Sequence, residues 1–477
     1  MERLLADAHV LARDWWDPSQ RLLLHPGGRL DDEVVPGGTH GLLPPTVWWA
    51  YGLLRRGEPG DRELAETAIR GVLDQQFDAP GAPWHATWPA TTAAADPMPG
   101  ATPFEDYDPN WRVFVGVGLA LVLRDHSLPE VLAGDVRHAV ERAVAADADR
   151  PVDATWTNVA VLRAWLELEV GRWCGDEGLL EVGAARAQSV AADAGVRGHV
   201  AEHASPTYTG ITLLGLSLWA ERPPVEDLAP LGRAMRDEVL HDLLAIWHPG
   251  LRTLVPPFTR AYGMDLRTHV GATGLWLAWL VDGLDPLPPL HEPPLHHAHD
   301  LPLVFVIEAL AGASDDVRAL APMVRAQPAR QGEWFDRVGE RVWTGWTGGD
   351  LAVGAEWSPV DWGGWWQMVT AAAIWRAPSG DNAWLRLQQR HGAVEARVEQ
   401  QDGVIRLAHG ATVGPLELWV GGGGQVEVTT TTLVHGGRTW RIEGVHEARP
   451  VPCDAPGVEA AWELLTDADG IALLTED

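Results

Sequence analysis

The sequence contains no lysine, so arginine supplies all 36 of its basic residues. A nucleotide-binding loop of the GxxxxGK[ST] type, a lysine Schiff base and pyridoxal phosphate bound to lysine all require a lysine side chain. The absence of lysine therefore excludes these three chemistries. Acidic residues number 66, and the formal net charge of -30 opposes nucleic acid or an anionic membrane as the main partner, because both need a basic surface.

Cysteine and long apolar runs are also scarce. The two cysteines, Cys174 and Cys453, have the spacing of neither a disulfide framework nor a metal or redox motif. The N-terminus is charged and amphipathic without the apolar core of a signal peptide, and no run is long and uncharged enough to span a bilayer. We expect a cytoplasmic protein, although a chain from which an export signal had been removed would show the same pattern.

The first 325 or so residues have the pattern of a helical domain. Apolar residues recur at spacings of three and four, and proline and glycine interrupt them. Helical pairs are predicted at 42–57 with 60–77, at 111–126 with 128–147, and at 156–173 with 176–195, and further helices at 209–221, 225–247 and 265–284. Successive antiparallel pairs of this size can stack into a ring, the (α/α) toroid, with the polar motifs in loops at one mouth.

Beyond about residue 330 the pattern changes to short runs of alternating apolar and polar residues. Turns with glycine or aspartate separate these runs, which is typical of an antiparallel β-sandwich. At 477 residues the chain is too long for one ordinary core. We therefore predict a mainly α protein in which residues 1–328 form an (α/α) toroid catalytic domain and residues 329–477 form an antiparallel β-sandwich.

Tyrosine is rare, with four in the chain, yet one of them lies in the loop sequence PPFTRAYGMD. Tyr262 follows Arg260 by two positions and precedes Asp265 by three. The tyrosine can act as a proton donor or acceptor whose pKa Arg260 lowers, or Arg260 can grip a substrate carboxylate. The alternative is a structural loop corner in which Arg260 and Asp265 pair with each other.

Asparagine is rarer still, and two of the three asparagines lie in polar and aromatic clusters. In YDPNWR, Asp108 or Asn110 can cap a helix that begins at Trp111, or all three can bind substrate. Asn158 lies in the first turn of an apolar helix that Thr155 or Thr157 could already cap. Its amide could bind a carboxylate without adding a titratable group.

Further candidate residues lie in three loops. EHASPTYTG holds Glu202, His203 and Tyr208, which could bind substrate or transfer protons, although Ser205 and Pro206 alone suit a helix start. His40 in the glycine loop GGTHG could line a site or belong to an ordinary turn. His299 lies in HEPPLHHAHD, a histidine cluster without the i, i+4 spacing of a helical metal site, so we expect no metal and treat His299 as a residue of the rim.

Tryptophan is abundant, with 26 residues. Most of them should pack in the core or between domains, but indole rings also stack on the apolar faces of sugars. Carbohydrate is therefore the leading class of substrate.

The sequences DPNWR, TNVAVLRAW, EHASPTY and RAYGMD, followed by a HAHD helix start and a β-sandwich, resemble a group of uncharacterised bacterial and fungal proteins. The architecture of that group is similar to that of the heparinase and alginate lyases. The resemblance spans roughly residues 30 to 375. It does not extend to His203 and Ala204, where that group tends to have an aromatic residue and an asparagine, so a base at His203 cannot be carried over.

The resemblance implies a lyase that cleaves a uronic-acid-containing saccharide by β-elimination, without a cofactor. Asn158 and Arg260 would neutralise the carboxylate of the uronic acid, and Tyr262, Tyr208 and His203 would transfer protons. His40, Asp108, Asn110, Trp111, Glu202, Asp265 and His299 would bind the substrate. The alternatives are a glycoside hydrolase that uses two carboxylates from Asp108, Glu202 and Asp265, a sugar epimerase or isomerase, and a non-catalytic carbohydrate-binding protein.

Overall fold

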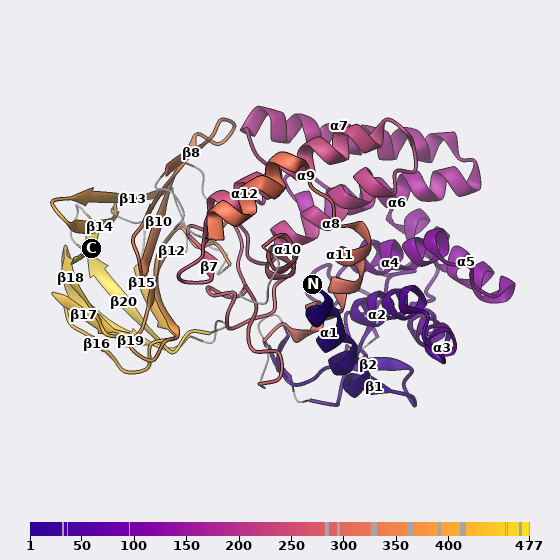
Figure 1. Ribbon diagram of the computed structural model, residues 1–477, viewed down its shortest axis with the longest axis horizontal. Coiled ribbons are helices and arrows are strands. Elements are labelled where there is room, and N and C mark those ends of the chain that lie inside the picture. The colour runs from indigo at the N-terminus through magenta and orange to yellow at the C-terminus, as the bar shows by residue number, and fades with distance from the viewer. Residues whose placement is uncertain are drawn as a thin grey trace.

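The structure is a computed structural model, and the residues it describes are 1–30, 33–35, 37–94, 96–281, 286–292, 296–325, 332–359, 367–389, 393–410, 416–453, 455, 457–466 and 470–476. Helices occupy the first two thirds of the chain and antiparallel strands the last third (Figure 1). The predicted order, a helical part followed by an antiparallel β part, is confirmed. The boundary between 328 and 329 stays a prediction; the last helix ends at Arg325 and the next strand begins at Gly332.

The helical part is built from antiparallel helix pairs joined by short connections. The four pairs are α2 (Leu43–Arg56) with α3 (Asp61–Leu73), α4 (Trp111–Asp125) with α5 (Glu130–Asp147), α6 (Thr157–Cys174) with α7 (Glu177–Arg197), and α8 (Tyr208–Glu221) with α9 (Leu228–Ala245). Because each first helix is followed by an antiparallel return helix, the first helices all run in the same direction. We call the end at which α2, α4, α6 and α8 begin the N-terminal mouth.

The first helix of each pair lies inside. Neighbouring inner helices contact one another in chain order: α2 with α4, α4 with α6, α6 with α8, and α8 with α10 (Ala272–Leu280). Helix α10 contacts η1 (Ala298–Leu303) and α11 (Val304–Leu310), and both of these contact α2, which closes the series. In α6 every residue from 157 to 171 is buried, and in α8 every residue from 209 to 220. Helix α8 is apolar on nearly all sides, which is typical of a helix inside a fold. Helix α6 carries charges, but they are paired in the interior, as Arg163 is with Glu167 at 2.8 Å. The remaining helices are α1 (Glu2–Trp15), which contacts α11 and η1, and α12 (Asp315–Arg325), which contacts α9.

The predicted helix at 265–284 is shorter than expected. Helix α10 begins only at Ala272, because Asp265 starts a turn in which its carboxylate accepts the backbone N–H of Arg267 at 3.0 Å. No helix in the described part of the chain is both long and apolar enough to cross a lipid bilayer. The helical part also contains short strands that were not predicted. They form a three-stranded sheet of β1 (Trp16–Asp17), β2 (Leu22–Leu24) and β5 (Gly41–Leu42), and two pairs, β3 (Gly28–Leu30) with β4 (Glu33–Val35) and β6 (Trp247–His248) with β7 (Thr253–Leu254).

The C-terminal strands form one continuous antiparallel ladder that folds into two layers. One layer follows the order β8, β9, β10, β11, β12, β15, β20, β19, the other the order β13, β14, β21, β18, β17, β16, and β10 pairs with β13 to join them. The bounds are β8 (Gly332–Asp336), β9 (Arg341–Thr347), β10 (Leu351–Ser358), β11 (Ala371–Arg376), β12 (Asn382–Gln389), β13 (Val394–Gln401), β14 (Val404–His409), β15 (Leu416–Gly421), β16 (Val426–Val428), β17 (Thr432–His435), β18 (Arg438–Glu443), β19 (Val445–Val451), β20 (Ala460–Thr466) and β21 (Ile471–Glu476).

The first of these layers packs on the helical part. All eight residues of β12 are buried, because its side chains meet apolar groups on both faces. At the contact, Phe258 bridges to Val369, and the backbone N–H of Ala261 donates to the carbonyl of Gln367 at 2.9 Å. This contact brings the loop that holds Arg260 and Tyr262 against the β part.

Candidate active site

The polar cluster at the N-terminal mouth is built on the loop between α7 and α8. Ser205 accepts the backbone N–H of Tyr208 at 2.8 Å, but α8 begins at Tyr208 after the N-cap residue Thr207, two residues later than the start predicted at Pro206. Thr209 donates to the carbonyl of Glu202 at 3.1 Å and accepts the N–H of Ser205 at 3.0 Å. Ala204 holds a left-handed φ of 52°, a strained conformation for alanine. The loop thus fixes Glu202 and Tyr208 relative to each other.

Glu202 caps helix α6 from a distance. One carboxylate oxygen accepts both the backbone N–H of Asn158 at 2.8 Å and its side-chain amide at 2.6 Å. Neither Thr155 nor Thr157 supplies the predicted cap, since α6 has no side-chain cap from its own N-cap residue. A carboxylate is favoured there by the free N–H groups and the dipole of the helix. The side-chain NH₂ group of Asn158 is therefore already bonded to Glu202.

Arg260 is the centre of the cluster. Its Nη1 donates to the other oxygen of Glu202 at 3.1 Å, its Nη2 to the hydroxyl of Tyr208 at 2.9 Å, and its Nε to the amide oxygen of Gln367 at 3.0 Å. The guanidinium also lies over the Tyr208 ring, 3.9 Å from the centroid. Burial opposes the charge, but Tyr208, Glu202 and Tyr262 together raise the pKa of Arg260 above its usual value. Arg260 is therefore a fixed cation.

The two candidate tyrosines are hydrogen-bonded to each other. The hydroxyl of Tyr208 donates to that of Tyr262 at 2.8 Å. Both side chains are half-buried, and the Tyr262 ring lies 4.8 Å from the ring of His297. His297 has a left-handed φ of 54°, and burial, followed by neighbouring histidines, lowers the pKa of His297 far below its usual value. Arg260, Tyr208 and Tyr262 thus form one chain of polar contacts.

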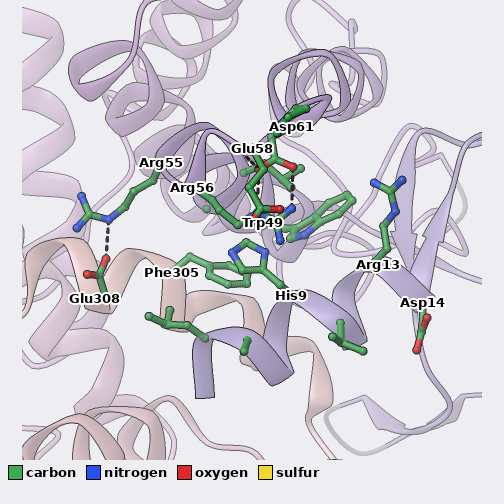
Figure 2. Close-up of a pocket in the computed structure, with 16 residues that line it drawn as sticks. His9, Arg13, Asp14, Trp49, Arg55, Arg56, Glu58, Asp61, Phe305 and Glu308 are labelled. Atoms are coloured by element: carbon green, nitrogen blue, oxygen red, sulfur yellow. Dashed lines mark hydrogen bonds and ion pairs between the residues drawn. The ribbon is translucent and has the colours of Figure 1, made fainter. Parts of the chain in front are cut away.

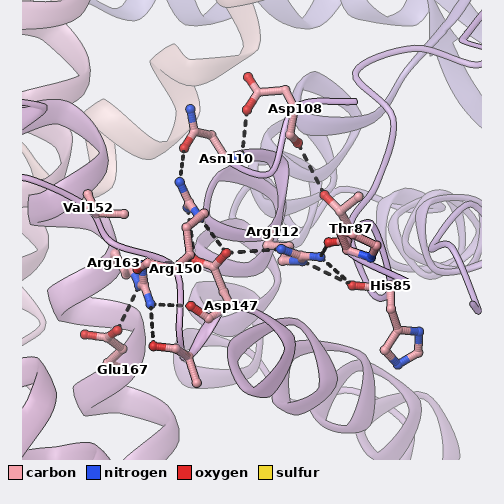
Figure 3. A network of polar contacts seen from close by, with 12 residues as sticks. His85, Thr87, Asp108, Asn110, Arg112, Asp147, Arg150, Val152, Arg163 and Glu167 are labelled. Carbon is pink, nitrogen blue, oxygen red and sulfur yellow. Dashed lines mark hydrogen bonds and ion pairs between the residues drawn. The ribbon is translucent and has the colours of Figure 1, made fainter. Parts of the chain in front are cut away.

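A second network begins at the start of α4 (Figure 3). The carboxylate of Asp108 accepts the backbone N–H of Asn110 at 2.8 Å, whereas the side chain of Asn110 makes no capping bond. Of the two predicted capping residues, Asp108 is therefore the one that bonds to the backbone at the start of α4. Arg150 donates to the amide oxygen of Asn110 at 2.9 Å and is held by Asp147 at 2.7 and 3.0 Å. Because its oxygen is engaged, Asn110 presents its NH₂ group as the remaining donor.

Asp108 links the two networks electrostatically. Burial raises the pKa of its carboxyl, against the N–H of Asn110 and the charges of Arg150 and Arg260. A carboxyl whose pKa is raised by desolvation is a candidate general acid. Arg150 and Arg260 therefore lie close enough to Asp108 for their charges to lower the pKa of its carboxyl.

His203 is not part of the cluster of Arg260 and the tyrosines. Its ring is stacked on Trp343 of β9 at 3.5 Å and lies 4.1 Å from His199. Burial, with His199 and Arg341, lowers the pKa of His203 well below its usual value. Its Nδ1 is buried and has no hydrogen-bond partner among the described residues. The structure thus places this predicted proton carrier in the packing between the helical part and the β part.

Asp265 also lies apart from Arg260. It is 1% exposed, bonds to the N–H of Arg267, and its pKa is raised to about 6 by burial. The Arg260–Asp265 pair that a loop corner would require does not form among the described contacts; the carboxylate partner of Arg260 is Glu202. Asp265 is thus a residue of the interface with the β part.

The remaining predicted residues lie at the same mouth. The carbonyl of His40 accepts the N–H of His25, whose ring lies 6.1 Å from that of His299. The ring of His299 in turn lies 4.9 Å from that of His297. Burial, together with the charge of His25, lowers the pKa of His299 to about 3. Trp111 begins α4 as predicted, but its ring lies 5.4 Å from Phe114 and packs partly on the core.

Three residues of this region were not predicted from the sequence: Gln367, His297 and Arg150. Gln367 comes from the β part, and no local pattern could assign it to Arg260. His297 belongs to the histidine cluster from which only His299 was selected. Arg150 precedes a proline in a plain loop. The described residues contain no group of three or more histidine, cysteine, aspartate or glutamate side chains arranged to hold a metal ion.

A cavity of about 1030 Å³ lies at the other end of the helices (Figure 2). Its walls include Arg55 and Arg56 at the C-terminal end of α2, about 20 Å from the start of that helix by the rise per residue. Arg56 is paired with Asp61 at 2.7 Å and Arg55 with Glu308 at 2.5 Å. The predicted site residues lie elsewhere, at the N-terminal mouth, which we take as the candidate active site.

Comparisons with known proteins identify the family and the fold. The family described as "Domain of unknown function (DUF8769)" matches residues 37–312, more than half of the chain, so the chain belongs to it. No curated protein matches. The structure is similar to the crystal structure of heparinase III, with a TM-score of 0.54 at 8% identity over 100% of this chain and 85% of that one. A comparison with a structure described as "Glycoside hydrolase" gives a TM-score of 0.29 at 11% identity, over 91% of this chain and 72% of that one.

Proposed function

We propose that this member of the DUF8769 family is a carbohydrate-active enzyme, and that it cleaves a uronic-acid-containing oligo- or polysaccharide or glycoside by β-elimination. The observation that carries the proposal is the hydrogen-bonded pair of Tyr208 and Tyr262 on the guanidinium of Arg260. The fold likeness to heparinase III supports the same class of reaction. It does so as an analogy of fold, not of site.

In the proposed reaction Tyr262 removes a proton from the substrate and later donates it to the leaving group. Its oxygen accepts a hydrogen bond from Tyr208, which Arg260 in turn holds, and this stabilises a negative charge on the Tyr262 oxygen. The tyrosinate removes the C5 proton of the uronic acid, the C4–O bond breaks, and a C4=C5 double bond forms. The proton then passes from Tyr262 to the leaving glycosidic oxygen, so no water is consumed.

The substrate carboxylate must be neutralised while C5 carries negative charge. Arg260 supplies the fixed positive charge, and the NH₂ group of Asn110 supplies a neutral donor. Asn158 contributes indirectly in this scheme, because its amide holds Glu202 and Glu202 holds Arg260. The role of Asn158 changes from a direct ligand to a positioning residue.

A glycoside hydrolase is the second candidate, and the raised pKa of Asp108 favours it. A protonated carboxyl could donate to the glycosidic oxygen, with Glu202 as its partner carboxylate. Both oxygens of Glu202 are already bound by Asn158 and Arg260, which disfavours a role for Glu202 as base or nucleophile. We therefore rank the hydrolase second.

Incubation with a panel of uronate-containing glycans tests the proposal. A lyase produces an unsaturated uronate that absorbs in the ultraviolet, whereas a hydrolase releases reducing ends without that absorbance. We expect Tyr262→Phe to lower turnover at least about 100-fold. Tyr51→Phe is the matched control, since the Tyr51 hydroxyl bonds to Asp125, away from the mouth. Equal rates for Tyr262→Phe and the parent on every responsive glycan would show that the role given to Tyr262 is wrong.

A further inference from the structure

Trp156 is an unusual tryptophan in this protein. It is 41% exposed, and among the described residues no other tryptophan falls in the exposed class. Burial of so large an apolar ring is normally favourable, so an exposed one at the rim of a polar site suggests a contact surface for a ligand.

The backbone holds Trp156 in this position. Asp153 accepts the N–H and the hydroxyl of Thr155 at 2.8 and 2.7 Å, and its carbonyl accepts the N–H of Trp156 at 3.1 Å. Trp156 is also the residue that directly precedes α6. The ring is therefore carried by a closed turn on a rigid helix.

A second exposed aromatic residue meets Trp156 from another loop. Phe104 is 54% exposed, and its ring lies edge to face with that of Trp156 at 5.8 Å. Phe104 has a left-handed φ of 67°, which is costly for a bulky side chain. Its N–H donates to the carbonyl of Tyr107 at 2.7 Å, and Thr102 donates to the carboxylate of Asp106 at 2.7 Å. The loop thus maintains a strained residue that presents its ring to solvent.

Both rings belong to segments that lead directly into the candidate active site. Trp156 precedes Asn158 by two residues, and Phe104 precedes Asp108 by four. The polar groups at these helix starts include Asn110, whose NH₂ group remains as a donor, and Arg150. An apolar surface beside amide and guanidinium donors suits a sugar ring, which has one apolar face and a rim of hydroxyls.

We propose that Trp156 and Phe104 form an aromatic platform on which a pyranose ring of the substrate stacks, as a subsite beyond the sugar that reacts at Tyr262. The inference rests on the proposed carbohydrate substrate and adds where the chain of sugars runs: from Tyr262 past Asn110 toward the starts of α4 and α6. The platform discriminates by length, because a short saccharide that fills the catalytic end does not reach it.

Binding in the Tyr262→Phe background tests the platform independently of turnover. Calorimetric titration with uronate-containing disaccharides, tetrasaccharides and hexasaccharides gives the dissociation constant for each length. We expect Trp156→Ala to raise the constant of the longer saccharides roughly tenfold, from the loss of one stacking contact, and to leave the disaccharide unchanged. Trp156→Phe should retain most of the affinity.

Phe335→Ala is the control, since Phe335 in β8 is a similarly exposed aromatic residue of the β part. It should bind every length as the parent does. Thermal unfolding of Trp156→Ala should match the parent, because the ring is largely outside the core. If Trp156→Ala binds all lengths like the parent, or if no saccharide of the panel binds, the platform is wrong. If length-dependent binding requires Trp156 but active protein yields no unsaturated product, the platform stands and the lyase assignment fails.

Discussion

Arg260 shows why arginine suits this mouth better than lysine could. Its three nitrogens donate to three different partners, Glu202, Tyr208 and Gln367, while its flat face covers the Tyr208 ring. An ammonium group has donors but no planar fork and no face to stack. At the scale of single residues, the site therefore depends on the shape of the guanidinium as much as on its charge.

Asp265 permits a prediction about pH. Burial raises its pKa to about 6 from 3.8, so between these values the folded protein keeps a proton that the unfolded chain releases. Stability from this group is therefore greatest below about pH 4, falls as the pH rises toward 6, and stays low above it. Between pH 4 and pH 7 we expect the free energy of unfolding of Asp265→Asn to rise by about 3 kcal/mol relative to that of the parent.

Denaturant unfolding of both proteins across this pH range measures the gain. Asp135→Asn, at an exposed position in α5, serves as the control and should follow the parent at every pH. Parallel curves for Asp265→Asn and the parent would mean that Asp265 keeps an ordinary pKa in the folded protein.

At the scale of elements, the helix starts at the N-terminal mouth are held by side chains other than those of their N-cap residues. Helices α4, α6 and α8 have no side-chain cap from their own N-cap residues. Glu202 instead reaches the first turn of α6 from a loop 44 residues later in the chain. A sequence pattern finds a local cap three residues away, so it could not find this one.

Helix α8 approaches α10 so closely that Gly210 leaves no room for a side chain. An added Cβ would lie 2.2 Å from the backbone carbon of Ala272 and 2.3 Å from the nitrogen of Thr273. We expect Gly210→Ala to push α8 from α10 and cost about 3 kcal/mol or more. Because α8 begins at Tyr208, the shift should also lower activity.

Thermal unfolding and glycan turnover together measure this change. Gly134→Ala in α5 is the matched control, as nothing lies within 4 Å of its added Cβ, and it should gain about 0.5–1 kcal/mol from helix propensity. A Gly210→Ala protein as stable and active as the parent would contradict the close approach.

At the scale of the whole molecule, a buried ion cluster joins the helical part to the β part. Asp336 of β8 binds Arg197 of α7 at 2.8 Å and Arg341 of β9 at 2.6 Å. Burial opposes its charge, but Arg341, the N–H of Gly339 and Arg197 together hold the pKa of Asp336 well below its usual value. The contribution to stability is therefore present above about pH 4 and is lost as the pH falls below it.

We expect Asp336→Asn to lower the free energy of unfolding by about 3 kcal/mol or more at pH 7, because it leaves two arginines without their buried carboxylate. The difference from the parent should shrink below about pH 4. Denaturant unfolding at several pH values measures both effects. Glu447→Gln removes an exposed ion pair with Arg449 and should unfold like the parent; an equal loss in both variants would show that burial of Asp336 does not matter.

The sequence predicted the elements better than the contacts. The helix pairs from α2 to α7 lie where the sequence pattern placed them, and the C-terminal third forms antiparallel strands as its alternation predicted; in β14 every second side chain is buried. Strand β11 (AAAIWR) is buried on nearly every side chain, so it has no alternation for a sequence pattern to detect.

By itself, the sequence determined that this is a lysine-free acidic protein with a helical part before an antiparallel β part, since composition and periodicity are local properties. It also selected Arg260, Tyr208, Tyr262, Asn158 and Glu202 as polar residues in unusual places. Only the tertiary structure decided that these five meet, that Gln367 joins them, and that His203 and Asp265 face the β part instead. Side chains such as Asn158 and Glu202, 44 residues apart, or Tyr208 and Tyr262, 54 residues apart, become partners through the packing of helices, and no local pattern encodes such contacts.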